Sequence, residues 1–127
     1  MSKVTTVAVV GASNNPQRIA YEAVGRLLQK NYAVIPVNPR GGEIQGQKVI
    51  ASVSAIHEPV HTVTMYINPA HQSDVLEEII ALKPQRVIFN PGSENPDAYS
   101  RLRKAGIAVQ EACTLVLLST RQFDLPV

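Results

Sequence analysis

Residues 5–18 read TTVAVVGASNNPQR and combine the features of a buried strand, a sharp turn and the start of a helix. The run Thr6–Val10 is β-branched except for one alanine and does not alternate polar with apolar residues, which is typical of a strand covered on both faces. Gly11 ends the run, and a glycine there permits a backbone conformation or a close approach that a side chain would hinder. Ser13–Asn15 offers helix-capping side chains, and Pro16 suits the first position of a helix. We therefore predict a strand–turn–helix unit whose helix amino end suits a phosphate group.

The helix predicted to begin at Pro16 has an unusual first turn, because it lacks Asp and Glu and instead carries Arg18. A cation is mildly unfavourable at the amino end of a helix, where the backbone dipole is positive. An anion supplied by a ligand would remove this disadvantage. We predict that Arg18 contacts a phosphate, and the alternative is a solvated surface arginine.

Four further strand-like segments alternate with helical patterns along the chain. Strands are expected at 33–37, 62–67, 86–89 and 107–109. Helices are expected to end near 30, to span 53–56, to run from Pro69 to 82 and from Pro96 to 105, and to span 115–118. We expect the second strand to lose its pairing near Pro36, and the connections to be too short for hairpins. The pattern predicts one α/β domain over residues 1–127, with a doubly wound, Rossmann-like parallel sheet of about five strands and helices on both faces.

The composition limits the possible functions of the chain. It has 127 residues, a formal net charge of +2, one cysteine and no tryptophan. The charge is too small and too dispersed to indicate nucleic-acid binding, and a single cysteine excludes an internal disulfide. No apolar run approaches the roughly 20 residues that span a bilayer, and the three histidines share no metal-ligand spacing. We expect no metal site, no nucleic-acid or membrane partner, and a cytoplasmic protein, since the first strand follows too closely on Met1 for a signal peptide.

The loops that follow the predicted strands form the candidate site, because ligands of such folds bind at the carboxyl ends of the strands. The candidate residues are Gly11, Ala12, Ser13, Asn14, Pro16, Arg18, Val37, Asn38, Pro39, Arg40, Asn68, Pro69, Gly92 and Cys113.

The residues of these loops narrow the choice of ligand. The first turn does not match the dinucleotide fingerprint G-x-G-x-x-G, since Ser13 and Pro16 occupy its second and third glycine positions. An NAD-binding protein also carries an acid near the end of the second strand, where this chain has Asn38-Pro39-Arg40. An arginine there suits a phosphorylated ribose. NADP, coenzyme A (CoA) and other phosphorylated adenine nucleotides therefore remain, while a P-loop NTPase is disfavoured because Gly-Lys-Ser and Gly-Lys-Thr are absent.

Several motifs in order along the chain resemble the small CoA-binding domain family. They are VVGAS at 9–13, VIPVNP at 34–39, Pro91-Gly92, AGIAV at 105–109 and Cys113. This family is similar to the N-terminal CoA-binding domain of the succinyl-CoA synthetase alpha subunit. The resemblance implies CoA as ligand, with its phosphates at Gly11, Ala12, Ser13 and Arg18. It places the adenosine beside Val37, Asn38 and Pro39, with Arg40 nearby and with Ile67, Asn68 and Pro69 as a further wall.

Three functional hypotheses follow from these observations. The first is non-catalytic binding of CoA or an acyl-CoA. The second is a small NADP-linked or acyl-transfer enzyme that uses the same crevice. The third is a regulatory or assembly subunit whose ligand signals to a partner chain, and the oligomeric state is left open. Cys113 is either a small buried hydrophobe or a functional thiol, and for the latter we expect a mixed disulfide with CoA.

Overall fold

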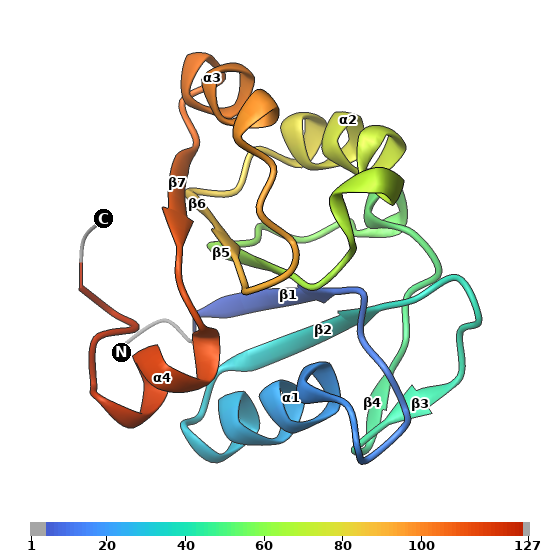
Figure 1. Cartoon of the computed structure of the whole chain (residues 1–127). Helices are drawn as coiled ribbons and strands as arrows, with labels where there is room; N and C mark the ends of the chain where they lie inside the picture. Colours follow the sequence, from blue (N-terminus) through green and yellow to red (C-terminus); the bar gives the residue numbers. More distant parts are fainter. Residues whose placement is uncertain (1–4, 126–127) are drawn as a thin grey trace.

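The computed structural model describes residues 5–125, and its central element is a five-stranded parallel sheet (Figure 1). The strands of this sheet are β1 (Thr6–Val10), β2 (Ala33–Val37), β5 (Thr62–Met65), β6 (Arg86–Phe89) and β7 (Ala108–Glu111). The helices are α1 (Ile19–Gln29), α2 (Ser73–Leu82), α3 (Pro96–Lys104) and α4 (Thr114–Ser119), with short 3-10 helices at Val53–Ala55 and Pro69–His71. The predicted doubly wound α/β fold with about five parallel strands is confirmed.

The two faces of the sheet are covered by different helices, with α2 and α3 above and α1 and α4 below in Figure 1. The strand β1 shows why both faces need cover, because its side chains alternate between two apolar clusters. Ala8 and Val10 pack in the cluster that contains Leu76, whereas Val7 and Val9 pack in the cluster that contains Leu27. These four of the five β1 side chains are buried, which explains a strand without polar alternation.

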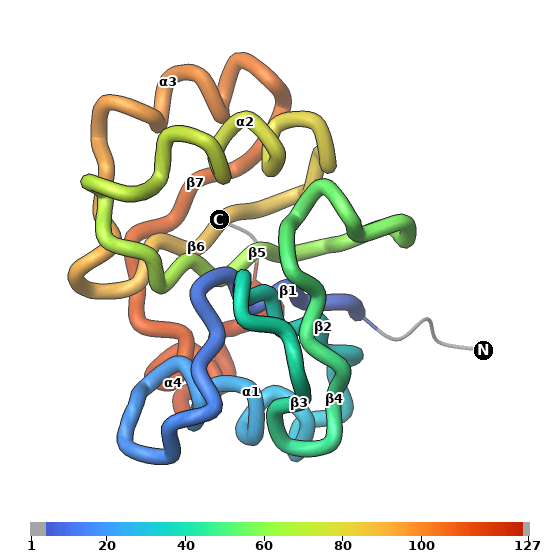
Figure 2. Tube along the Cα trace, turned by 90° about the vertical axis from the view of Figure 1, so that its right-hand side faces the viewer, coloured from blue at the N-terminus to red at the C-terminus, as the bar shows by residue number. Residues whose placement is uncertain are grey.

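The strand order β2-β1-β5-β6-β7 places the change of direction between β1 and β5. The chain leaves β1 to form β2 on one side, and later adds β5 on the other side of β1. The loops that follow β1 and β5 therefore diverge at this point and leave a crevice outside the carboxyl ends of the strands. Figure 2 turns the carboxyl ends of β1 and β2 toward the viewer.

The first helix begins later than predicted. Pro16 lies in a turn in which the Arg18 amide donates to the Asn15 carbonyl at 2.9 Å, and α1 starts at Ile19. Arg18 is the extended N-cap residue, with ψ of 142°, so no helix runs through it from Pro16. The predicted absence of acid from the first turn is also wrong, since that turn contains Glu22.

A small antiparallel hairpin, β3 (Glu43–Ile44) and β4 (Gln47–Lys48), contradicts the expectation that no hairpins form. It lies beside the β1–α1 loop in Figures 1 and 2. The side chain of Gln45 at its tip donates to the Tyr21 carbonyl at 2.9 Å. A methyl group added to Gly25 would meet this side chain at 2.6 Å, so the glycine gives the hairpin room to contact α1.

The expected loss of pairing at Pro36 is also wrong, because β2 pairs with β1 through Val37. The carbonyl of Pro36 points away from β1 and accepts a hydrogen bond from the Ile50 amide at 2.9 Å. Since β2 is an edge strand of this sheet, the missing N–H of a proline removes no hydrogen bond of the ladder.

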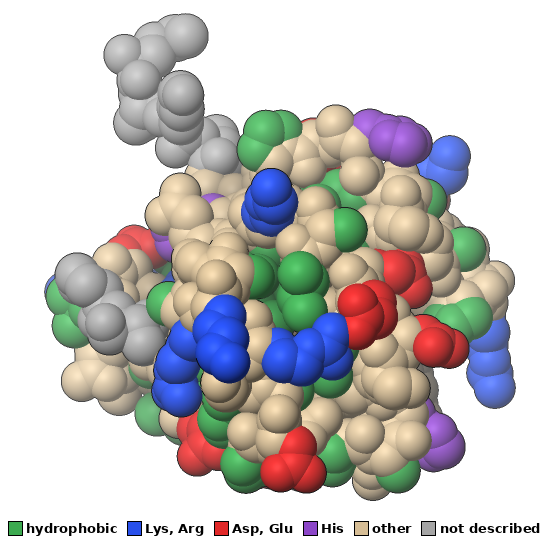
Figure 3. Space-filling model, turned by 90° about the horizontal axis from the view of Figure 1, so that it is seen from above, with side chains coloured by type: hydrophobic (Ala, Val, Ile, Leu, Met, Phe, Trp, Pro, Cys, Tyr) green, Lys and Arg blue, Asp and Glu red, His purple; other side chains and the backbone are tan. Residues whose placement is uncertain are grey.

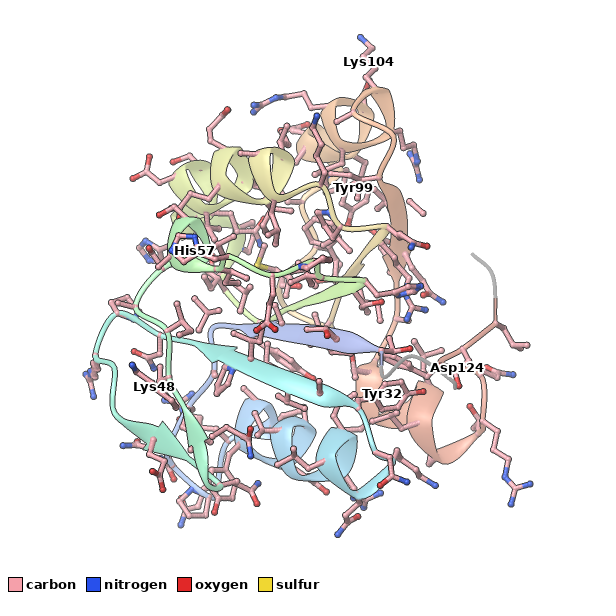
Figure 4. The ribbon with its side chains drawn as sticks, turned by 180° about the vertical axis from the view of Figure 1, so that it is seen from behind. Tyr32, Lys48, His57, Tyr99, Lys104 and Asp124 are labelled. Carbon is pink, nitrogen blue, oxygen red and sulfur yellow. The ribbon has the colours of Figure 1, made fainter. Side chains whose placement is uncertain are left out.

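The C-terminal segment closes the end of the sheet opposite the site. The buried guanidinium of Arg86 donates to the Phe123 carbonyl at 2.8 Å. Its carbon atom also lies 4.5 Å from the centre of the Phe123 ring. Tyr32 donates to Asp124 at 2.5 Å, and Figure 4 shows this pair at the opposite end of the molecule from Lys48 and His57. This end is therefore held together by contacts of its own and leaves the other end free for the site.

Candidate functional site

A cavity of about 480 Å³ lies at the carboxyl ends of β1, β2 and β5, where the strand order changes direction. This volume is in the range of small-molecule sites. Its lining residues are Val10, Gly11, Ala12, Val37, Asn38, Pro39, Ala51, Ser52, Val53, Ile67, His71, Asp74, Val75 and Glu78. Five of the candidate site residues are among them: Gly11, Ala12, Val37, Asn38 and Pro39. Ile67, which the resemblance places in a further wall, lines the cavity as well.

Gly11 is required by the backbone at the turn after β1. Its φ angle is +88°, and a Cβ atom there would approach Cγ1 of Ile67 to 3.0 Å. The amides of Gly11 and Ala12 both donate to the Val37 carbonyl at 3.1 Å. These two amides are therefore used to join the β1 loop to β2, and a phosphate would need other donors.

The next two residues of this loop supply such donors. The amides of Ser13 and Asn14 donate to no protein acceptor within residues 5–125. The hydroxyl of Ser13 accepts from the Asn15 amide at 3.1 Å, and the Asn15 side chain accepts from the Gln17 amide at 3.0 Å. The loop is thus shaped by its own side chains, and it leaves two consecutive amides available to an anion.

Asn38 joins the loop after β1 and its own loop after β2 to the segment at Ile50. Its Nδ2 donates to the Ala12 carbonyl at 2.6 Å, and its Oδ1 accepts from the Arg40 amide at 2.8 Å. Its own amide donates to the Ile50 carbonyl at 3.0 Å. This asparagine therefore fixes the position of the cavity wall in addition to forming part of it.

The wall opposite the β1 loop comes from α2 and the segment before it. His71 precedes α2, and Asp74 and Glu78 lie four residues apart on the helix, so they share one face of it. Glu78 is half-buried and accepts from the Ser54 amide at 2.8 Å, which joins α2 to the 3-10 helix at Val53–Ala55. Figure 3, which views the molecule from the side of α2 and α3, shows acidic side chains with Lys and Arg side chains beside them.

The described residues that line the cavity include carboxylates but no lysine or arginine. Arg18 and Arg40 are exposed and lie on the two loops whose neighbouring residues line the cavity. The cavity itself is therefore unfavourable for a phosphate, while both adjoining loops carry a positive charge.

The other predicted site residues lie outside the lining of the cavity. They are Ser13, Asn14, Pro16, Arg18, Arg40, Asn68, Pro69, Gly92 and Cys113. Asn68 caps the 3-10 helix that begins at Pro69, through a 2.9 Å bond from the Ala70 amide. Gly92 lies in an exposed turn with φ of +92°.

Cys113 is half-buried and is the N-cap residue of α4. Beside it, Asn90 joins β5 to α4: its Nδ2 donates to the Thr64 hydroxyl at 2.7 Å, and its Oδ1 accepts from the Thr114 amide at 2.8 Å. The Tyr66 hydroxyl is buried near these groups and has no hydrogen-bond partner among the described residues, and its burial raises the pKa of the phenol to about 12. Cys113 is therefore next to an ordered polar network, at the same end of the sheet as the cavity.

Sequence reasoning missed the α2 wall and the loop at Ala51–Val53. The acids at 74 and 78 have helical spacing, but this spacing alone indicates a solvated helix face. Only the folded arrangement brings that face against the β1 and β2 loops. The described residues contain no group of three His, Cys, Asp or Glu that could hold a metal ion. Nor does any helix within residues 5–125 have the length and apolar character needed to cross a membrane.

Comparison with known proteins finds both similar sequences and similar structures. Uncharacterized protein YneT of Bacillus subtilis is 29% identical over 103 residues, which are 81% of this chain and 76% of YneT. The alpha subunit of ADP-forming acetate–CoA ligase II from Pyrococcus furiosus is 43% identical over 51 residues, which are 39% of this chain but only 11% of that subunit. A crystal structure of an uncharacterized protein matches with a TM-score of 0.89 and 40% identity, over 96% of this chain and 100% of the other.

A family match covers a larger part of the chain than the ligase similarity does. Residues 5–119 match the family described as "CoA binding domain". These residues include every strand and helix of the structure and all the loops around the cavity. The chain therefore belongs to the CoA binding domain family.

Proposed function

We propose that this protein binds CoA or an acyl-CoA at the carboxyl ends of its strands, without catalysing a reaction on it. The observation that carries the proposal is the cavity where the strand order changes direction, walled by the β1, β2 and β5 loops. Membership of the CoA binding domain family supports CoA as the ligand.

The chemistry of the residues fits the two ends of an adenine nucleotide. The apolar side chains of Val10, Val37 and Ile67 offer surfaces for a nucleobase, and the cavity is large enough for a nucleoside. The free amides of Ser13 and Asn14 suit the pyrophosphate. In this arrangement the nucleoside occupies the cavity and the phosphates lie outside it, along the β1–α1 loop.

Two arginines are assigned to the charged groups of the ligand. Arg18, the N-cap residue of α1, is assigned to the pyrophosphate, and Arg40, in the loop after β2, to the 3′-phosphate of the ribose. Both are exposed, so each is available to a ligand.

The proposal assigns no reaction because the titratable residues of the cavity do not form an acid–base pair. In the part of the chain that the structure describes, His71, Asp74 and Glu78 make no hydrogen bonds to one another, and Glu78 accepts from a backbone amide. Cys113 lies outside the cavity lining and has no His, Asp or Glu as a hydrogen-bond partner among the described residues.

Calorimetric titration with CoA, dephospho-CoA, NADP and NAD tests the proposal. We expect micromolar CoA binding, about −8 kcal/mol, and weaker binding of dephospho-CoA. Arg18→Ala and Arg40→Ala should each weaken CoA binding, and only Arg40→Ala should remove the preference for the 3′-phosphate. Arg103→Ala on α3 is a matched control at a remote exposed site. Binding of NADP without binding of CoA would contradict the proposal.

A further inference from the structure

We propose that Glu78 recognises the adenine end of the ligand by accepting a hydrogen bond from its 6-amino group. This inference rests on the proposed function, since it names the residue that selects the base at the same site. It follows from the position of Glu78 in the cavity, from its fixed orientation and from the distribution of charge around it.

Glu78 lies at the end of the cavity that is farther from the phosphate-binding amides. A second cavity of about 340 Å³ adjoins the first, and its lining includes Val53 and Glu78 but no residue of the β1 loop. Because Val53 and Glu78 line both cavities, they mark the boundary between them. A nucleotide with its phosphates at Ser13 and Asn14 therefore points its base toward this boundary.

The carboxylate of Glu78 is held in place before any ligand arrives. One of its oxygens accepts from the Ser54 amide at 2.8 Å, which fixes a long side chain that is otherwise mobile. A carboxylate has lone pairs for several donors, so the group keeps capacity for a ligand. It accepts hydrogen bonds and donates none, so it selects for a ligand atom that carries a hydrogen.

The negative charge of the cavity disfavours a phosphate beside Glu78 and favours the base of the nucleotide there. Among the described residues that line the cavity there is no lysine or arginine, and Glu78 forms no ion pair within residues 5–125. A phosphate beside it would be repelled, whereas an amino group would be attracted. The 6-amino group is the hydrogen-bond donor on the base edge of adenine, and purine without this group offers acceptors alone at that edge.

The test compares CoA with a CoA analogue whose base is purine without the 6-amino group, by calorimetric titration of the full chain. The wild-type protein should bind the analogue roughly tenfold to a hundredfold more weakly, because a hydrogen bond to a charged acceptor is lost. Glu78→Gln is the informative variant: its amide oxygen still accepts from Ser54, but its NH₂ group then faces the ligand. This variant should bind CoA and the analogue with affinities that differ by less than about threefold.

Asp74→Asn is the matched control, because it removes a charge from the same helix face one turn earlier. It should retain the preference for CoA over the analogue, and thermal unfolding should show that both variants remain folded. Equal loss of the preference in both variants would overturn the assignment to Glu78, as would a preference that persists in Glu78→Gln. Equal binding of the two ligands by the wild-type protein would overturn this inference and leave the proposed function intact. Failure of CoA to bind at all would overturn the proposed function as well.

Discussion

The substitution Asn38→Ala removes the side chain that joins the loops around the cavity. It deletes two hydrogen bonds, from Nδ2 to the Ala12 carbonyl at 2.6 Å and from the Arg40 amide to Oδ1 at 2.8 Å. At about 1 kcal/mol net for each bond, the free energy of unfolding should fall by about 2 kcal/mol. For a domain of this size, that corresponds to a fall in melting temperature of roughly 6 to 10 °C.

The same substitution should weaken CoA binding, because the loops are then ordered only when the ligand binds. If the two lost hydrogen bonds contribute their full free energy, about 2 kcal/mol, to keeping the loops in the conformation that binds the ligand, the affinity for CoA falls by up to about thirtyfold. Asn38→Asp keeps the acceptor for the Arg40 amide but sets a carboxylate against the Ala12 carbonyl. We therefore expect CoA binding at least as weak as in the alanine variant.

Gln45→Ala is the matched control for this prediction. The side-chain amide of Gln45 also donates to a backbone carbonyl, that of Tyr21 at 2.9 Å, but the residue does not line the cavity. It should lower stability by no more than about 1 kcal/mol and leave the CoA affinity unchanged. An Asn38→Ala melting temperature equal to the wild-type value would refute the role of Asn38 in joining the loops. A lower melting temperature with unchanged CoA affinity would refute the placement of the ligand between them.

Three further predictions concern the stability of the scaffold. Gly11→Ala should cost about 1–3 kcal/mol, because it combines a φ of +88° with a Cβ 3.0 Å from Cγ1 of Ile67. Gly106→Ala, with φ of +84° and open space around the Cβ, should cost less in the same thermal unfolding assay; an equal cost would show that the Ile67 contact is unimportant. Asn90→Ala removes three hydrogen bonds of a buried side chain and should lower the free energy of unfolding by about 3 kcal/mol in a urea titration, so a loss under about 1 kcal/mol would contradict its role. Burial lowers the pKa of His61, so the unfolded chain takes up a proton more readily and stability should fall as the pH decreases below about 6.5; His61→Gln should flatten this dependence, and an unchanged pH profile would contradict it.

The sequence was sufficient to predict the sheet, because burial on both faces leaves a local signal. The run Thr6–Val10 is almost wholly β-branched and lacks polar alternation, and the structure buries it between two apolar clusters. The turn at Gly11 was recognisable because glycine readily adopts the positive φ found there. The loop at Asn38-Pro39 was recognisable because Asn and Pro are both common in turns. Four residues of these loops line the cavity, together with Val37 at the end of β2.

The start of α1 was predicted wrongly because the residues that are typical of a helix start also form other hydrogen-bonded turns. Asn15 and Pro16 are typical of a helix start, but here they form a turn that the Arg18 amide closes on the Asn15 carbonyl. The extended conformation of Arg18 then separates this turn from the helix. Capping residues alone do not distinguish one hydrogen-bonded turn from the first turn of a helix.

The α2 wall and the β3–β4 hairpin depend on contacts between segments far apart in the sequence. Glu78 reaches Ser54 across 24 residues, and Gln45 reaches Tyr21 across 24 residues as well. Neither pair has a spacing that one helix or one hairpin could produce. A single sequence does not reveal such contacts, so only the structure identifies Glu78, the residue proposed to recognise the 6-amino group of the base.

The distribution of charge around the site determines the orientation of the proposed ligand. Asp74 and Glu78 are in the cavity, whereas Arg18 and Arg40 are on the adjoining loops outside it. A nucleotide that entered with its phosphates first would bring like charges together, since no lysine or arginine is among the described residues that line the cavity. A nucleotide that entered with its base first brings donors to acceptors and anions to cations. The same arrangement acts against inorganic phosphate in the cavity, so the adenine end must contribute to affinity for the site to distinguish CoA from simple anions. Selection of the base and orientation of the phosphates are then two consequences of one separation of charge.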